Sequence, residues 1–447
     1  MKDSTNSAAT GATDKTSLEA LILHVYPWWE MQRVRQMSFI TQKAEPPPCN
    51  AWRHTSQLID HKYRGVTTPN CDTIYSGAWL DLAHGPVLIE VPKTDLPYWS
   101  IAVMDLNTDN LAVLGSRYPE SSTLLICGPT FQGPLPTDIP SVRSKSQVAW
   151  LLARYLIGSP ALLASSEALR RGVSLSKWPV EAAKRVSAAS PLRTELIRAV
   201  RKDAQNFWNI IHATFKEDPG LRKNIQTDAS LDSELAWPEG INSWGELNAD
   251  FQASFASAFD KVVTQITANN SGNIQTHGQW RYPGPDIGNF GTNALYRAEV
   301  SLWGLGALET NEVLYVSTFT DSEGAQLDGA RSYRFRIPPE GIPAEAFWSL
   351  TMYEVDPFGG MYFTDNPLGR YAIGDRTDGL VKNDDGSIDI WIAHQSPPEA
   401  KQSLNWLPAP TGLFRLMLRV YAPTPEFAAA TVCPPSVDPW VFNGFKS

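Results

Sequence analysis

The chain has 447 residues, and 38 Lys and Arg against 47 Asp and Glu give a formal net charge of −9. This length allows one large domain or two to three ordinary domains with a substantial core. Charged residues make up 19% and hydrophobic residues 43%, which excludes a mainly disordered chain. The acidic balance argues against sequence-independent nucleic-acid binding, and the lack of a run of about eighteen apolar residues argues against a membrane span.

The N-terminus and the cysteines bear on the cellular compartment. Residues 1–15 are polar and lack the apolar core of a signal peptide, which predicts a cytoplasmic protein as written. If a native signal has been removed, the protein would be secreted or periplasmic. No CxxC or HExxH spacing occurs, so we expect no metal site and favour free thiols over disulfides at the four isolated cysteines, Cys49, Cys71, Cys127 and Cys433.

The first half of the chain begins with a predicted disordered tail over residues 1–17. The apolar spacing over 18–40 predicts a helix, which Pro27 should kink or restart. From about residue 66 to residue 129 apolar residues alternate between turns, which predicts strands. The clearest strands are expected at 86–92, 98–105 and 124–127, whereas 148–157 fits either a strand or a helix.

The second half begins with a region, 159–268, that is predicted to be mainly helical, most clearly at 192–208 and 247–266. A loop rich in Gly, Pro and Asn should follow over 269–292, and then a short helix over 294–308. Strands are expected again at 313–318, 331–337, 347–353, 388–393 and 413–421.

These elements predict an α+β protein that is mostly β, with two β domains joined by a helical insert. The predicted boundaries are a tail at 1–17, a helix plus β domain at 18–175, the insert and loop at 176–290, and a second β domain at 291–447.

Two groups of motifs carry a family resemblance. The first is TPNCDTIYSGAWLDL at 68–82, followed by GPVL at 85–88. The second comprises YRA at 296–298, FWSLTMY at 347–353, NP and RY within 366–371, DGS at 385–387, NWLP at 405–408 and RVY at 419–421.

Together these motifs resemble the paired domains of unknown function DUF1254, at the N-terminal side, and DUF1214, at the C-terminal side. The resemblance covers most of residues 50–175 and 290–425. It implies a two-domain β protein whose C-terminal domain is a jelly-roll-like sandwich. The resemblance implies no common reaction and no catalytic residues, so candidates have to come from the chemistry of the motifs.

Asp72 is the first candidate. If 70–82 is a strand, Asp72 shares a face with Ile74 and Ala78, while Tyr75 and Trp79 point to the other side. A carboxylate on an apolar face must be hydrogen-bonded, paired or protonated. Asp72 therefore either caps the turn after residues 69–70, which the sequence favours, or acts as a general acid or base at the mouth of a pocket.

Asp105 is in the same situation, on a predicted face with Trp99, Ile101 and Val103. If the strands of Asp72 and Asp105 adjoin, the two carboxylates could share a proton. A solvated turn rich in Asn and Asp at 107–110 is the favoured alternative.

Polar and aromatic residues elsewhere supply further candidates. His61 and Arg64, in the polar segment before the Asp72 strand, are ordinary loop residues or have acid–base and anion-orienting roles. Arg419 shares a predicted strand face with Arg415, and such arginines either hold an anionic group or pair with local acids such as Glu354 or Asp356. Two aromatic candidates for substrate contact, which could equally be core residues, are Trp79 and Tyr353.

The sequence contains no GxGxxG after a strand, no GxxxxGK[ST], no GxSxG and no kinase motif set, so we expect no cofactor. It favours a cofactor-independent acid–base enzyme, of hydrolase, lyase or isomerase/cyclase type, acting on a small, largely apolar metabolite between the β domains. The predicted catalytic residues are Asp72, Tyr75, His61 and Asp105, and the predicted substrate-binding residues are Arg64, Trp79, Tyr353 and Arg419.

The alternative is a non-catalytic ligand- or carbohydrate-binding β-sandwich protein, in which exposed tryptophans would contact sugar rings. In either case the expected partner is a small molecule, with no nucleic acid and no membrane span. The aromatic content is also compatible with a homo-oligomer.

Overall fold

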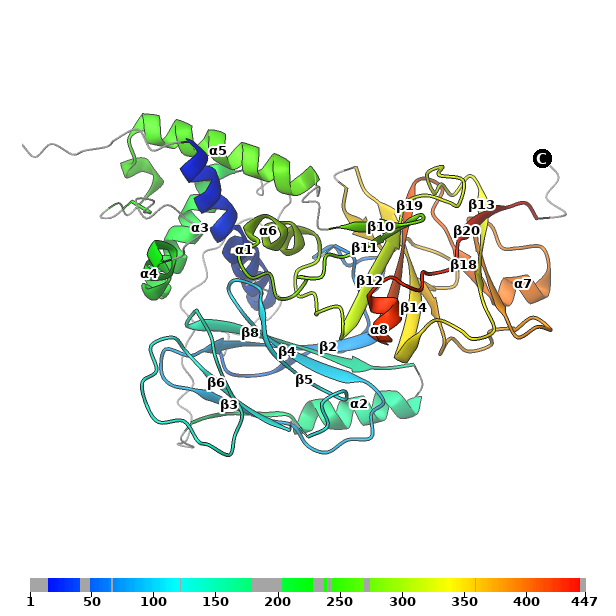
Figure 1. Ribbon diagram of the computed structural model, residues 1–447, viewed down its shortest axis with the longest axis horizontal. Helices are drawn as coiled ribbons and strands as arrows, with labels where there is room; N and C mark the ends of the chain where they lie inside the picture. The colour runs from blue at the N-terminus through cyan, green and yellow to red at the C-terminus, as the bar shows by residue number, and fades with distance from the viewer. Residues whose placement is uncertain are drawn as a thin grey trace, which may run out of the picture.

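The computed structural model describes residues 15–40, 49–65, 67–120, 122–158, 160–178, 203–227, 237–238, 241, 243–268, 274–357 and 359–442. These residues form two β domains with a layer of helices above the first one (Figure 1). The predicted class, an α+β protein that is mostly β with a helical insert, is confirmed.

The N-terminal domain contains two sheets that pack face to face. The first has the order β1 (Arg53–His54), β2 (Thr73–Asp81), β8 (Val148–Leu156), β4 (Trp99–Asp105) and β5 (Asn110–Gly115). The second has the order β7 (Ser141–Arg143), β6 (Thr123–Cys127), β3 (Val87–Glu90) and β9 (Ser174–Lys177). Alternation along β2 sends Ile74, Ala78 and Leu80 into the core between the sheets, as expected for a half-buried strand. The ambiguous segment 148–157 is thus a strand, and helix α2 (Pro160–Gly172) follows it.

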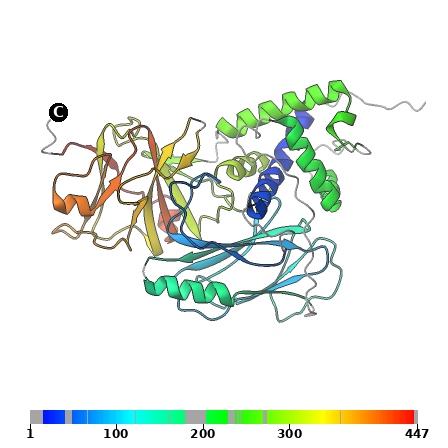
Figure 2. The same cartoon turned by 180° about the vertical axis from the view of Figure 1, so that it is seen from behind.

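Helices cover the other face of the five-stranded sheet (Figures 1 and 2). They are α1 (Lys15–Ile40), α3 (Ala204–Glu217), α4 (Gly220–Thr227), the 3-10 helix η2 (Trp244–Glu246), α5 (Ala249–Ala268) and α6 (Ala294–Trp303). The helix α1 runs through Pro27 as one element. Asn293 caps α6 by accepting a hydrogen bond from the backbone N–H of Tyr296. The tail predicted at 1–17 and the helix predicted at 192–208 lie largely outside the described residues.

The C-terminal domain is a sandwich of two sheets, as the family resemblance implies. One sheet has the order β10 (Gln275–His277), β11 (Trp280–Tyr282), β12 (Val313–Thr318), β19 (Phe414–Pro423), β14 (Ala344–Val355) and β15 (Met361–Tyr362), with β16 (Ala372–Gly374) also paired to β14. The other has the order β18 (Trp406–Pro408), β17 (Ile388–Ala393), β13 (Ser332–Ile337) and β20 (Val437–Trp440). Their facing apolar side chains form one core, and the short helices α7 (Ala400–Leu404) and α8 (Pro425–Ala428) complete the domain.

Two local expectations are wrong. The segment 269–292 is not only a loop, because β10 and β11 form a hairpin that extends the sheet of the sandwich. The helix predicted over 294–308 ends at Trp303, and Gly304 is its C-cap. Glycine has a low helix propensity, so Gly304 favours the end of the helix. Gly306 then has a positive φ, and its carbonyl oxygen accepts a hydrogen bond from Arg154 of the first domain.

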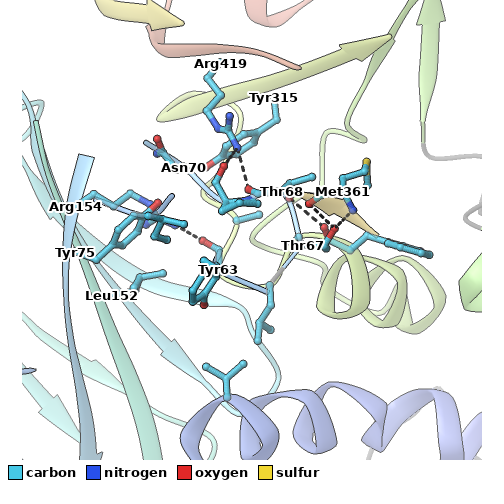
Figure 3. A pocket seen from close by; sticks show the side chains of 18 of the residues that line it. Tyr63, Thr67, Thr68, Asn70, Tyr75, Leu152, Arg154, Tyr315, Met361 and Arg419 are labelled. Carbon is cyan, nitrogen blue, oxygen red and sulfur yellow. Dashed lines mark hydrogen bonds between the residues drawn. The ribbon is translucent and has the colours of Figure 1, made fainter. Parts of the chain in front are cut away.

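The two domains are joined at Thr68, Pro69 and Asn70, just before β2. The buried guanidinium of Arg419 donates to the carbonyl oxygens of Thr68 (3.0 Å) and Pro69 (3.3 Å). The Tyr353 hydroxyl also donates to the Pro69 carbonyl (2.6 Å), and the Asn70 amide donates to the Tyr421 hydroxyl (2.6 Å). We call this set of contacts the domain joint; part of it is drawn in Figure 3. It fixes the start of β2 against the sheet of the sandwich.

The turn after β4 is buried, so the expectation of a solvated turn at 107–110 is wrong. Its Asn and Asp residues form hydrogen bonds within the protein instead of with water. The indole N–H of Trp28 donates to Asn107 Oδ1 (2.8 Å), and the Phe290 N–H donates to Asp109 Oδ1 (3.0 Å). The Asn110 N–H donates to the Gly288 carbonyl (2.6 Å).

Asp105 itself is 0% exposed, and its Oδ1 accepts a hydrogen bond from the Asn107 N–H (2.8 Å). Burial raises the pKa of Asp105 to about 6, and the nearby Asp109 acts in the same direction. A proton shared between Asp72 and Asp105 is excluded, because β8 separates β2 from β4. Thr73, next to Asp72, pairs with one end of β8 and Asp105 pairs with the other.

We predict that Tyr353→Phe lowers the free energy of unfolding by about 1 kcal/mol, because the domain joint loses one hydrogen bond while Arg419 still satisfies Pro69. Denaturant unfolding measures this change. Tyr118→Phe, at an exposed tyrosine, is the matched control and should have no effect. Equal stability of Tyr353→Phe and the wild type would show that this bond does not stabilise the joint.

We also predict that Asp105→Asn changes how stability depends on pH. Between the unfolded pKa, near 4, and the folded pKa, about 6, the folded wild type binds the extra proton. Its free energy of unfolding should therefore fall as pH rises through this window, by up to about 1.4 kcal/mol per pH unit. The variant has no titrating group at this position, so its free energy of unfolding should not fall in this way. Relative to the wild type it should gain stability from pH 4 to pH 7, as measured by urea unfolding at each pH. A constant difference between the two proteins would contradict the prediction, and Asp138→Asn is an exposed control.

Candidate functional site

A cavity of about 990 Å³ lies between the two β domains and the helices. Its first wall is the helix-facing side of β2 and β8, and its second is one face of β11, β12 and β19 in the sheet of the sandwich. The helices α1 and α6 and the segment 53–63 close the remaining sides. The domain joint fixes the position of the first wall relative to the second. Residues of α6 line the space between the two walls.

The wall from the first domain places a cation and a phenol together. Arg154, on β8, is 5% exposed and donates to the Gly306 carbonyl (2.5 Å). Its guanidinium carbon lies 5.7 Å from the ring centroid of Tyr75, on the neighbouring strand β2. Among the described residues the Nη1 atom of Arg154 has no hydrogen-bond partner. Figure 3 shows Arg154 and Tyr75 side by side in the cavity wall, with Tyr315 of the other domain above them.

Tyr315, on β12, is the phenol that the second domain contributes near Arg154. Burial raises the pKa of the Tyr315 hydroxyl, whereas the charge of Arg154 acts in the other direction. The hydroxyl is therefore protonated at neutral pH and can donate a hydrogen bond to a molecule in the cavity.

The wall from the second domain places two further cations on either side of Ser317. Arg281 pairs with Ser317 across β11 and β12, and Ser317 pairs with Met417 across β12 and β19. Arg415 donates to the Ser317 hydroxyl and, at 2.9 Å, to the Met361 sulfur. Burial lowers the pKa of Arg415 to about 9, and the charge of Arg281 is the next cause.

Positive charge predominates in this cavity. Five arginines line it: Arg53, Arg154, Arg281, Arg415 and Arg419. The last four form no ion pair with a carboxylate in the described part of the chain. Carboxylates contribute two lining residues, Asp60 and Glu299.

Three residues selected from the sequence line this cavity: Tyr75, Trp79 and Arg419. Trp79 stacks on Trp150 of β8, with ring centroids 5.4 Å apart, and so forms part of an apolar wall. Arg419 lines the cavity but is already held by the domain joint and by the Thr351 hydroxyl (2.8 Å). The predicted common face of Arg415 and Arg419 is confirmed.

Asp72 lies outside the cavity lining, at the domain joint. Its carboxylate accepts a hydrogen bond from the Ser349 hydroxyl (2.6 Å). The expectation that Asp72 caps the turn is wrong in its detail, because Asn70 Oδ1 accepts from the Asp72 N–H (2.7 Å) and so caps it. Asp105 also lies outside the lining, buried in the turn after β4.

The remaining sequence candidates also lie outside the lining. His61 Nδ1 is 2.9 Å from the Tyr371 hydroxyl, and Arg64 pairs with Glu354 (2.9 Å). Glu354, one of the two acids expected to pair with Arg415 or Arg419, thus pairs with Arg64 instead. Tyr353 is fully buried in the domain joint.

Sequence reasoning missed Arg154, Arg281 and Tyr315. Arg154 had a usable signal, because it is the one charged residue in the otherwise apolar strand VAWLLARYL. Arg281 had none, since the strand that carries it lies in a segment with the composition of a loop.

The structure places other features as follows. The four cysteines are unpaired, with Cys49 and Cys127 buried and Cys433 exposed. Within the described ranges no cluster of three or more His, Cys, Asp or Glu side chains is arranged to hold a metal ion. In the same ranges no helix has the length and apolar character needed to cross a membrane.

Comparison with solved structures finds similar chains, and the first of the following two shares the fold of this protein. The VPA0106 protein from Vibrio parahaemolyticus is 19% identical, with a TM-score of 0.67 over 96% of this chain and 100% of that chain. An uncharacterised protein from Burkholderia cenocepacia is 11% identical, with a TM-score of 0.46 over 97% of this chain and 91% of that one. No curated protein matches the sequence.

Family models match both β domains. The model described as protein of unknown function DUF1254 matches residues 49–177, and the one described as protein of unknown function DUF1214 matches residues 312–425. The first match spans both sheets of the N-terminal domain, one of which forms a cavity wall, and the second spans most of the sandwich that forms the other wall. The chain therefore belongs to the proteins of unknown function that pair an N-terminal DUF1254 domain with a C-terminal DUF1214 domain.

Proposed function

We propose that this protein is a cofactor-independent acid–base enzyme whose substrate, a small and largely apolar molecule, occupies the cavity between the two β domains. The observation that carries the proposal is the meeting of Arg154, Tyr75 and Tyr315 in a cavity of about 990 Å³. Ligand cavities of this kind are mainly apolar and hold a few convergent polar groups.

Tyr75 is the proposed proton-transfer residue. Its phenol would give a proton to a substrate atom, and the phenolate formed would be stabilised by the adjacent Arg154. That phenolate would take a proton back later in the turnover, which restores the phenol. Tyr315 would donate a hydrogen bond to the oxygen on which negative charge develops. This chemistry fits hydrolysis, elimination, hydration or isomerisation, the classes that proton transfer alone can drive.

Asp72 and Asp105 fit the proposal less well than Tyr75, because neither lines the cavity. The catalytic roles of Asp72, His61 and Asp105 stay predictions. Turnover by the variants Asp72→Asn and Asp105→Asn would test two of them directly.

The alternative function, non-catalytic ligand binding, is favoured by one observation. Arginines supply most of the charge in the cavity. Because they stay protonated near neutral pH, they can bind a ligand but do not exchange protons with it. Carbohydrate binding through exposed tryptophans has less support, because all sixteen tryptophans lie in the described ranges and none of them is exposed.

We predict that Tyr75→Phe lowers turnover by about 10²-fold or more, because it removes the proton-transfer group. Binding should weaken by no more than about fivefold, which corresponds to one lost hydrogen bond of about 1 kcal/mol. A library of small apolar molecules would be screened for ligands by thermal shift and then for conversion by mass spectrometry, with Tyr118→Phe as the control.

Unchanged turnover in Tyr75→Phe would remove this residue from the mechanism. Ligands that bind the wild type tightly but emerge unaltered after long incubation would favour the binding protein over the enzyme.

A further inference from the structure

We propose that the ligand of the cavity is an amphiphilic anion, with its acidic headgroup, a carboxylate or a phosphate, bound between Arg281 and Arg415. This inference rests on the proposed function for the location of the ligand, and it adds the chemical class and the orientation of that ligand.

The first argument is the register of three neighbouring strands. Arg281 on β11, Ser317 on β12 and Met417 on β19 form one row across the sheet, so their side chains project from the same face. Arg415 precedes Met417 by two residues and therefore lies on that face too. Its guanidinium donates to the Ser317 hydroxyl. Two cations and one hydroxyl thus converge at one place in the cavity wall.

The second argument is the electrostatic cost of this arrangement. Arg281 and Arg415 are both partly removed from water, and neither forms an ion pair with a carboxylate of the described residues. The charge of Glu299, which also lines the cavity, acts on Arg281 from a greater distance. The pKa of Arg415 is lowered to about 9 by burial and by the charge of Arg281, which means that the charged form is disfavoured there. An anion bound between the two guanidinium groups would offset their charge, partly as a carboxylate and fully as a doubly charged phosphate. It would also accept hydrogen bonds from both, in the geometry that arginine offers to carboxylates and phosphates.

Two of the other lining arginines, Arg419 and Arg154, have different environments. Arg419 already donates to Thr68, Pro69 and Thr351 in the domain joint, which leaves it fewer hydrogen atoms for a ligand. Arg154 lies on the opposite wall beside Tyr75, where the proposed reaction takes place (Figure 3). A headgroup anchored at Arg281 and Arg415 would therefore leave Arg154 free to act on a second polar group of the ligand.

The third argument concerns the apolar part of the ligand. A cavity of about 990 Å³ is far larger than an inorganic anion needs and is at the upper end of the range for organic ligands. Much of the remaining lining is apolar and partly aromatic, with contributions from Met37, Trp79, Trp150, Leu152, Trp303 and Leu305. Such a wall buries a hydrocarbon chain or ring system and stabilises it by removing apolar surface from water.

The test is a titration of the full-length protein with four probes: decanoate, decyl phosphate, the neutral decanol and inorganic phosphate. Binding is followed by calorimetry and by the fluorescence of the tryptophans in the cavity wall. We expect decanoate or decyl phosphate to bind about tenfold or more tightly than decanol, the effect of charge-assisted hydrogen bonds. Preference between the two anions then distinguishes a carboxylate from a phosphate headgroup.

Variants locate the headgroup. In Arg415→Met and in Arg281→Met the preference for the anion over decanol should fall to about threefold or less, while decanol itself binds as before. Arg171→Met, which makes the same charge change at an exposed ion pair on α2, is the control and should keep the full preference. If one of these variants does not fold, the other still tests where the headgroup binds, and the wild-type series tests the preference for an anion.

Each contrary result has one meaning. Decanol binding as tightly as decanoate and decyl phosphate would overturn the anion site but leave the proposed function standing. Inorganic phosphate binding as tightly as decyl phosphate would overturn the amphiphile. If none of the three decyl compounds binds, both the inference and the proposed cavity function are wrong. An anion preference that survives in both arginine variants would overturn the assignment to Arg281 and Arg415.

Discussion

The structure depends on one buried cation, Arg419, which forms no ion pair with a carboxylate of the described residues, although the charge of Asp72 acts on it from a greater distance. Arg419 is 3% exposed, and its charge is compensated by neutral oxygen atoms: the carbonyls of Thr68 and Pro69 and the hydroxyl of Thr351. Transfer of a guanidinium from water into a protein is costly unless hydrogen bonds replace its hydration. Those bonds can form only when the segment before β2 lies on the sheet of the sandwich. The relative position of the two domains, and hence the cavity between them, follows from this requirement.

The segment that meets Arg419 is itself held in an uncommon conformation. Thr68 has a φ of 51°, a value that a β-branched residue rarely adopts and that costs of the order of 1 kcal/mol or more. This conformation directs the Thr68 carbonyl to Arg419 and the Pro69 carbonyl to both Arg419 and Tyr353. The hydrogen bonds of the domain joint offset the strain. A few hydrogen bonds in the domain joint thus hold the two β domains together, and the cavity lies beside these bonds.

Much of the fold could be predicted from the sequence, because strand periodicity is a local property. Alternation correctly placed Tyr75 and Trp79 on one face of β2, and Arg415 and Arg419 on one face of β19. The site could be predicted only in part. Its walls combine β8, β11 and β12, and which strands adjoin depends on long-range pairing that a single sequence does not reveal. The prediction of a solvated turn after β4 was wrong for the same reason. Asn and Asp residues are typical of solvated turns, and the distant partners that bury them here are not visible in the sequence.

That turn also constrains the order in which the chain can fold. Its polar groups are satisfied by Trp28, which is synthesised before it, and by Gly288 and Phe290, which emerge from the ribosome about 180 residues later. Closing so long a loop is slow compared with local pairing. The first β domain therefore leaves the ribosome with part of its turn chemistry unsatisfied, and it reaches its final packing only when the start of the second domain has arrived. The final packing of this turn is thus coupled to a segment that lies outside the domain to which the turn belongs.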